Sequence, residues 1–77
     1  MQKTLDAFAI GESGIVKTVQ GEGKMKRRLF DMGITPGAQI YLRKCAPLGD
    51  PIEVTLRGYE LTLRKTEAAL VTMEVVK

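Results

Sequence analysis

The sequence contains no histidine and a single cysteine, and both shortages limit its chemistry. Histidine is the commonest general base and the commonest protein ligand for metals, so its absence argues against acid–base catalysis and against an imidazole metal site. One thiol, Cys45, cannot form a disulfide within the chain or a zinc site built from several thiolates. The residues therefore predict a protein that is not an enzyme, in a reducing compartment.

Long hydrophobic runs are also missing. Residues 1–10 lack the continuous apolar stretch of a secretory signal, and no run approaches the roughly 18 apolar residues needed to span a bilayer. The 77 residues are 44% hydrophobic and 27% charged, which is the composition of a globular chain rather than a disordered one. We expect a single domain over residues 1–77, located in the cytoplasm.

Hydrophobic periodicity predicts a mainly β chain with one short α-helix. A turn at 11–14 precedes a β-branched run at 15–19, which is typical of a strand. From Lys24 to Met32, the residues Met25, Leu29 and Met32 recur with the spacing of one helix face. Gly33 then stands where a left-handed residue commonly ends a helix.

Alternation of apolar and polar residues predicts the other strands. One begins at Ala38, and two more cover 52–57 and 59–63, with a change of apolar parity across Gly58 that indicates a tight hairpin. A brief helical turn at 65–70 precedes a last strand at 71–75. About five strands, with a short helix after the first, predict a small antiparallel β-barrel whose helix plugs one open end.

The segment APLGDPI at 46–52 joins two of these strands through a rigid loop. Pro47 and Pro51 each fix φ and lack an amide donor, so neither fits the middle of a strand, and the Gly-Asp pair between them is typical of turns. Leu48 is an apolar residue within this loop. Two interpretations stay open: Leu48 folds back over the core, as most loop leucines do, or it projects and contacts a partner.

Basic residues concentrate in the predicted helix. Four of the 12 Lys and Arg residues lie between Lys24 and Arg28, although the net charge of the chain is only +3. A cluster of this kind suits phosphate, anionic lipid or an acidic protein surface, and it is also what an ordinary solvated helix face carries.

Metal-binding residues are few. Cys45 would need ligands from elsewhere, such as the hard oxygens of Asp50 and Glu53. Met25, Met32 and Met73 could be soft ligands, but they have the spacing of core residues. The stretch GEGK at 21–24 lacks the glycine interval and the following Ser or Thr of a phosphate loop. The residues predict no catalytic, cofactor-binding or metal-binding site.

Three motifs in this order closely resemble the ferrous iron transport protein A (FeoA) family. They are LFDMGITPG at 29–37, APLGDPI at 46–52, and GYELTLRK at 58–65 with the EA pair that follows it. The match extends from about Leu29 to Val76, and the N-terminal third agrees only in type. The resemblance implies a small SH3-like antiparallel β-barrel in the bacterial cytosol, accessory to the membrane ferrous iron permease FeoB.

The resemblance makes binding to the FeoB permease, as a regulator or scaffold, the leading hypothesis. The chain would then reach the inner face of the plasma membrane only peripherally, through the permease, and a homo-oligomer stays open. The residues predicted to bind this partner are Lys26, Arg27, Leu29, Met32, Pro47, Leu48 and Asp50.

Two alternatives stay open. A nucleic-acid-binding barrel is disfavoured because the basic cluster has no interleaved aromatic residues for stacking on bases. Direct carriage of Fe(II) would need a surface or intersubunit site built from carboxylates, because the sequence supplies no closed ligand set for this ion.

Overall fold

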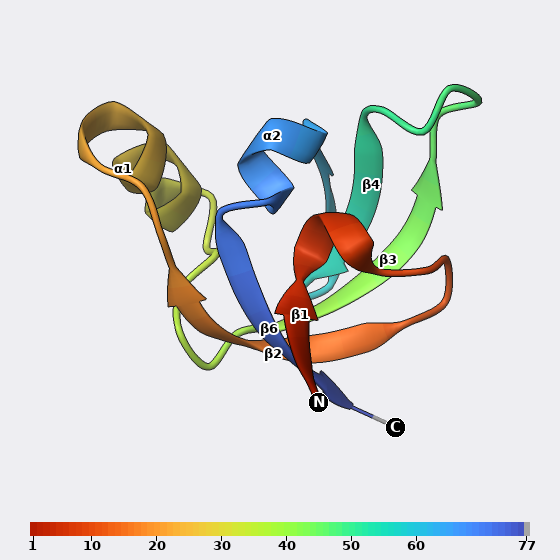
Figure 1. Ribbon diagram of the computed structural model, residues 1–77, viewed down its shortest axis with the longest axis horizontal. Helices are drawn as coiled ribbons and strands as arrows, with labels where there is room; N and C mark the ends of the chain where they lie inside the picture. Colours follow the sequence, from red (N-terminus) through yellow and green to blue (C-terminus); the bar gives the residue numbers. More distant parts are fainter. Residues whose placement is uncertain (77) are drawn as a thin grey trace.

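The computed structural model describes residues 1–76, which form one curved antiparallel sheet with short helices beside it (Figure 1). The strands follow the order β1-β6-β2-β3-β4-β5 across the sheet. None of the described helices has the length and apolar composition needed to cross a bilayer. In chain order the elements are β1 (Gln2–Thr4), the 3-10 turn η1 (Leu5–Ala7), β2 (Ser13–Val19), α1 (Gly23–Asp31), β3 (Gln39–Cys45), β4 (Ile52–Leu56), β5 (Tyr59–Leu63), α2 (Lys65–Ala68) and β6 (Val71–Val76).

The predicted mainly β, antiparallel architecture is confirmed, and the described residues add one strand to it. Strand β1 pairs with β6, with Gln2 opposite Glu74 and Thr4 opposite Thr72. Its three residues show no apolar alternation, so the pairing depends on β6 rather than on a local pattern. The predicted hairpin is confirmed as well: β4 and β5 join through Arg57 and Gly58, both with positive φ, in a two-residue turn.

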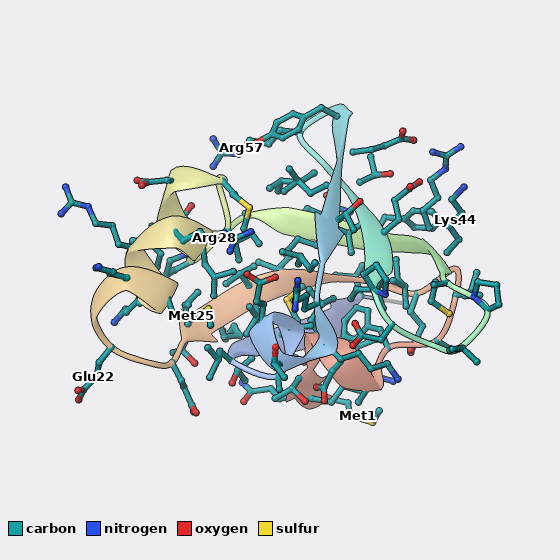
Figure 2. All side chains as sticks on the ribbon, turned by 90° about the horizontal axis from the view of Figure 1, so that it is seen from above. Met1, Glu22, Met25, Arg28, Lys44 and Arg57 are labelled. Carbon is teal, nitrogen blue, oxygen red and sulfur yellow. The ribbon has the colours of Figure 1, made fainter. Side chains whose placement is uncertain are left out.

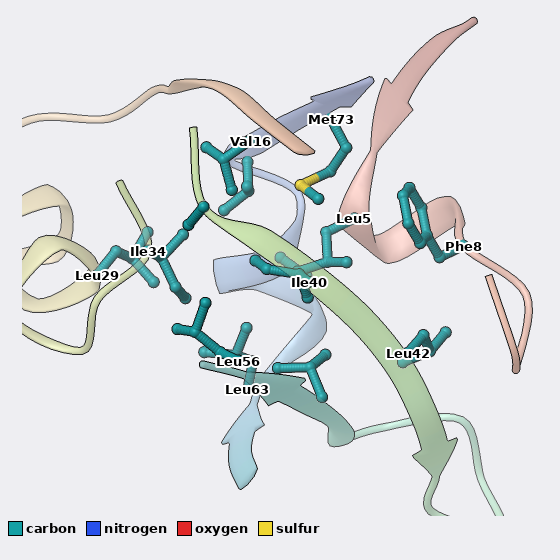
Figure 3. Packing of buried hydrophobic residues seen from close by; sticks show 14 of the residues in the cluster. Leu5, Phe8, Val16, Leu29, Ile34, Ile40, Leu42, Leu56, Leu63 and Met73 are labelled. Atoms are coloured by element: carbon teal, nitrogen blue, oxygen red, sulfur yellow. The ribbon is translucent and has the colours of Figure 1, made fainter. Parts of the chain in front are cut away.

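The core fills the inside of the curved sheet (Figure 3). Alternate residues of the central strands point inward, as the predicted periodicity requires, and Met73 of β6 is fully buried among them. This confirms that Met73 packs in the core. The buried cluster consists of Leu5, Phe8, Val16, Val19, Leu29, Ile34, Ala38, Ile40, Leu42, Ile52, Val54, Leu56, Leu63, Ala68, Val71 and Met73.

Helix α1 was predicted to plug an open end of the barrel, and this prediction is wrong for most of the helix. Leu29 is its one buried side chain, whereas Met25 on the same stripe is 39% exposed. Figure 1 shows that α1 stands at one side of the molecule, whereas α2 and η1 lie over the curved sheet. The first turn of α1 therefore extends beyond the core.

The end of α1 is formed as predicted. Gly33 has φ +93°, its N–H donates to the Phe30 carbonyl at 2.9 Å, and the Ile34 N–H donates to the Leu29 carbonyl at 3.0 Å. This pair of hydrogen bonds is the Schellman motif, in which a left-handed residue satisfies the last helical carbonyls. The Tyr59 hydroxyl also donates to the Met32 carbonyl at 2.8 Å, so β5 holds the same helix end.

Replacing Gly33 with valine should destabilise the fold more than replacing it with asparagine. Both side chains would crowd the Tyr59 hydroxyl and Leu56, because a Cβ at Gly33 would lie 3.0 Å and 3.3 Å from their atoms. Asparagine tolerates the left-handed conformation, which a β-branched residue resists, so we expect valine to cost about 1–2 kcal/mol more. Urea unfolding of both variants measures the difference, and equal stabilities would contradict the role given to Gly33.

Glu12 fastens the loop that follows η1. Its Oε1 accepts hydrogen bonds from the Ala9 N–H at 2.6 Å and from the Lys3 Nζ at 2.8 Å. The backbone hydrogen bond, and after it Lys3, lower the pKa of the Glu12 carboxyl below its ordinary value. The Glu12 carboxylate, whose pKa is lowered, thus stabilises the N-terminal part of the fold.

Candidate docking surface

The Pro loop, residues 46–51, projects from the end of the β3–β4 hairpin. The Gly49 N–H donates to the Ala46 carbonyl at 2.7 Å, and the Ala46 N–H donates to the Pro51 carbonyl at 2.9 Å. Gly49 takes φ +88°, which a side chain would resist. Leu48, at the tip of this closed turn, is 96% exposed. The interpretation in which Leu48 folds over the core is therefore wrong, because these bonds hold the tip away from the sheet.

Asp50 braces the Pro loop against α2. Its Oδ1 accepts a hydrogen bond from the Lys65 N–H at 3.0 Å, which satisfies one of the free amides at the start of that helix. A Cβ on Gly49 would lie 3.6 Å from the Lys65 Nζ, so the loop also passes close to the Lys65 side chain. Asp50 was predicted to bind a partner, and within the chain it holds the loop in place.

A shallow hollow of about 290 Å³ lies at the base of the Pro loop, lined in part by Cys45, Pro47 and Glu53. Cys45 is exposed, but Glu53 is already bound by Arg43, whose Nη1 lies 3.0 Å from its carboxylate. Among residues 1–76 no three His, Cys, Asp or Glu side chains come together in a way that could hold a metal ion. The residues that line the hollow are therefore a mixture of apolar and polar side chains and do not form a metal site.

Helix α1 divides the other predicted partner-binding residues into two groups. Leu29 is fully buried and Met32 is half-buried against the core, so both serve mainly to hold the helix on the barrel. Arg27 is exposed and Lys26 is half-buried. The Lys26 Nζ lies 5.7 Å from the centre of the Phe30 ring, which is within the range of a cation–π contact.

Glu67 is a connecting residue to which the sequence analysis gave no role. It is 3% exposed, its Oε1 accepts a hydrogen bond from the Arg64 N–H at 2.9 Å, and its Oε2 lies 3.5 Å from the Arg28 Nη1. The first contact closes the start of α2, and the second joins α2 to α1. A glutamate three residues after the start of a helix is the sequence signal that could have revealed the first of these contacts.

The structure brings α1, α2 and the Pro loop to the same side of the molecule, which we call the docking face (Figure 1). Figure 2 looks down onto this face, with Arg28 between α1 and the centre of the barrel and Lys44 at the opposite side. Helix α2 contacts the other two elements, through Glu67 and Arg28 on one side and through Lys65 and Asp50 on the other. Of the residues predicted to bind a partner, the exposed ones therefore lie on this one side of the molecule; they are Arg27, Pro47, Leu48 and Asp50.

Comparison with known proteins gives a family for this fold. Residues 3–75 match the model of the FeoA domain. The fusion protein of Fe(2+) transport protein A and the Fe(2+) transporter FeoB from Porphyromonas gingivalis is 32% identical over 72 residues. That match covers 94% of this chain and 8% of the fusion protein, so the chain spans a small part of this relative.

Solved structures agree in fold and in family. The NMR structure of a FeoA-like protein from Clostridium acetobutylicum is 41% identical, with a TM-score of 0.92, and the match covers 99% of this chain and 88% of that one. FeoA from Stenotrophomonas maltophilia, a prokaryotic SH3 domain protein solved with zinc, is 26% identical, with a TM-score of 0.82. That match covers 94% of this chain and 89% of the relative. The SH3-like barrel predicted from the sequence is thereby confirmed.

Proposed function

The chain belongs to the FeoA family, and from this premise we propose that it is a cytosolic accessory protein of ferrous iron uptake that binds a FeoB-type permease. The family is one of accessory proteins of iron transport rather than of enzymes. The chain would work at the inner face of the membrane, as a regulator or scaffold of the permease, and Fe(II) would be the cargo of that permease.

The observation that carries the proposal is the exposure of Leu48 on a braced loop. A leucine that is 96% exposed gains nothing from the core, and its burial against a partner would remove apolar surface from water. The hydrogen bonds of Gly49 and Asp50 already hold the loop, so little further ordering is needed on binding. An apolar side chain on a preorganised loop is a typical anchor of a protein–protein contact.

The fused relative supports the choice of partner. In the Porphyromonas gingivalis protein, a segment similar to this chain and the FeoB transporter form one polypeptide, which supports an association between such a segment and FeoB. Direct carriage of Fe(II) has less support, because the Glu53 carboxylate beside Cys45 is already paired with Arg43. We therefore propose FeoB binding as the function of the docking face.

The direct test measures binding of the purified chain to the immobilised cytosolic domain of the permease. The wild-type chain should be retained, and Leu48→Ser should weaken binding by about 30-fold or more, which is the effect of losing an anchor worth about 2 kcal/mol. Ile10→Ser is the matched control, because Ile10 is also an exposed loop residue, at 61%, outside the docking face. Failure of the permease domain to retain the wild-type chain would refute the proposal.

A further inference from the structure

One side of α1, next to and opposite the buried Leu29, combines positive charge with an aromatic ring: Arg27 and Phe30 are exposed and Lys26 is half-buried. Successive residues of an α-helix are about 100° apart, so Arg27 lies nearly opposite the buried Leu29. Phe30 follows Arg27 by three residues and Lys26 by four, which places the three on neighbouring positions of the helix surface. We call Lys26, Arg27 and Phe30 the α1 outer face.

Helix α1 carries four cations and one carboxylate, Asp31, which is exposed and follows Arg27 by four residues. Of its four cations, only Arg28 forms an ion pair among the described residues, with Glu67. The first turn holds no acidic residue, although carboxylates there would favour the helix dipole and cations oppose it. The helix dipole therefore does not explain the cations in the first turn of α1. An anion outside the molecule would favour them.

The aromatic side chain of the α1 outer face indicates what kind of anion. Phe30 is 39% exposed and lies beside Lys26 and Arg27. An aromatic ring beside cations suits the boundary of a bilayer, where the ring enters the acyl region and the cations meet the phosphates. Helix α1 lies at one end of the molecule (Figure 2), so a flat surface could approach it without meeting the sheet.

We propose that the α1 outer face adsorbs to anionic phospholipid headgroups. The proposed contact with lipid is argued from the geometry of α1 alone. That this contact orients the docking face toward a membrane permease rests on the proposed function. Each basic residue near an anionic surface strengthens binding by about fivefold, so the three unpaired cations support only weak, reversible adsorption. Nucleic acid is the less favoured anion, because one ring offers little stacking for bases.

Co-sedimentation of the purified chain with lipid vesicles tests this proposal without the permease. We expect binding to vesicles that contain phosphatidylglycerol, loss of that binding in high salt, and no binding to pure phosphatidylcholine. Lys26→Gln/Arg27→Gln should lower the partition coefficient by about 30-fold. Lys17→Gln/Lys44→Gln removes the same charge from exposed positions on β2 and β3, and we expect a decrease of less than about threefold.

A separate variant tests the contribution of the Phe30 ring to lipid binding. Phe30→Ser should weaken binding to the anionic vesicles by several fold at unchanged net charge, because the ring enters the interface. Equal losses in the two double variants would show that net charge alone acts and would overturn the proposal. Binding to a DNA duplex or to polyglutamate, with none to the vesicles, would also overturn it. Each result is independent of the permease-binding test, so failure of one proposal is distinguishable from failure of the other.

Discussion

Replacing Leu29 with alanine will lower the free energy of unfolding by about 2–5 kcal/mol, the usual cost of truncating a buried leucine. Leu29 is fully buried and is the one side chain that α1 places in the core. Its carbonyl also accepts the Ile34 N–H that closes the helix end. A chain of this length is expected to have a total stability of roughly 4–12 kcal/mol, so the loss is a large share of it.

Met25→Ala is the matched control for this prediction. Met25 lies on the same stripe of α1, one turn earlier, but is 39% exposed, so its truncation should cost about 1 kcal/mol or less. Urea unfolding at constant temperature measures both variants. If Leu29→Ala cost less than about 1 kcal/mol, α1 would not be held on the barrel by this residue.

Leu48→Asp will leave the melting temperature of the protein nearly unchanged and will abolish permease-dependent ferrous iron uptake. The side chain is 96% exposed, so an aspartate at this position stays in water and the fold loses no contact. At an interface with the permease, the same carboxylate would be buried without a partner, which is more costly than the loss of the leucine.

Melting temperature and uptake must be measured on the same variant, in cells that depend on the introduced gene. Ile10→Asp places the same charge on another exposed loop and should preserve both properties. A large fall in the melting temperature of Leu48→Asp would mean that the leucine supports the fold, and uptake would then fall only because folded protein is lost. Normal uptake with a normal melting temperature would remove Leu48 from the docking surface.

Elements that depend on local sequence could be predicted. The β4–β5 hairpin was evident from the change of parity across Gly58, because a two-residue turn fixes the register of its strands. The end of α1 was evident from Gly33, because few other residues accept its left-handed conformation. In both cases the deciding interactions lie within a few residues of each other.

Features that depend on distant residues could not be predicted. Strand β1 forms because Gln2 pairs with Glu74, near the other end of the chain. The three residues of β1 contain no pattern that predicts this pairing. The Pro loop is also held by the hydrogen bond between Asp50 and Lys65 of α2, a contact with a distant residue that the loop sequence alone did not reveal, so two interpretations of Leu48 stayed open. The contact of Glu67 with Arg28 joins α2 to α1. It could be predicted only if the relative position of these two helices were already known.

The pairing of β1 with β6 has a consequence for how this domain can be tethered. Gln2 and Glu74 lie opposite each other on neighbouring strands, and this end of β1 and β6 lies across the barrel from α1, α2 and the Pro loop (Figure 1). A polypeptide joined to either end would therefore leave the docking face unobstructed. A short flexible tether gives an effective concentration of about millimolar, enough for even a weak contact to be occupied much of the time. The fold is thus suited to fusion with another protein beside either β1 or β6.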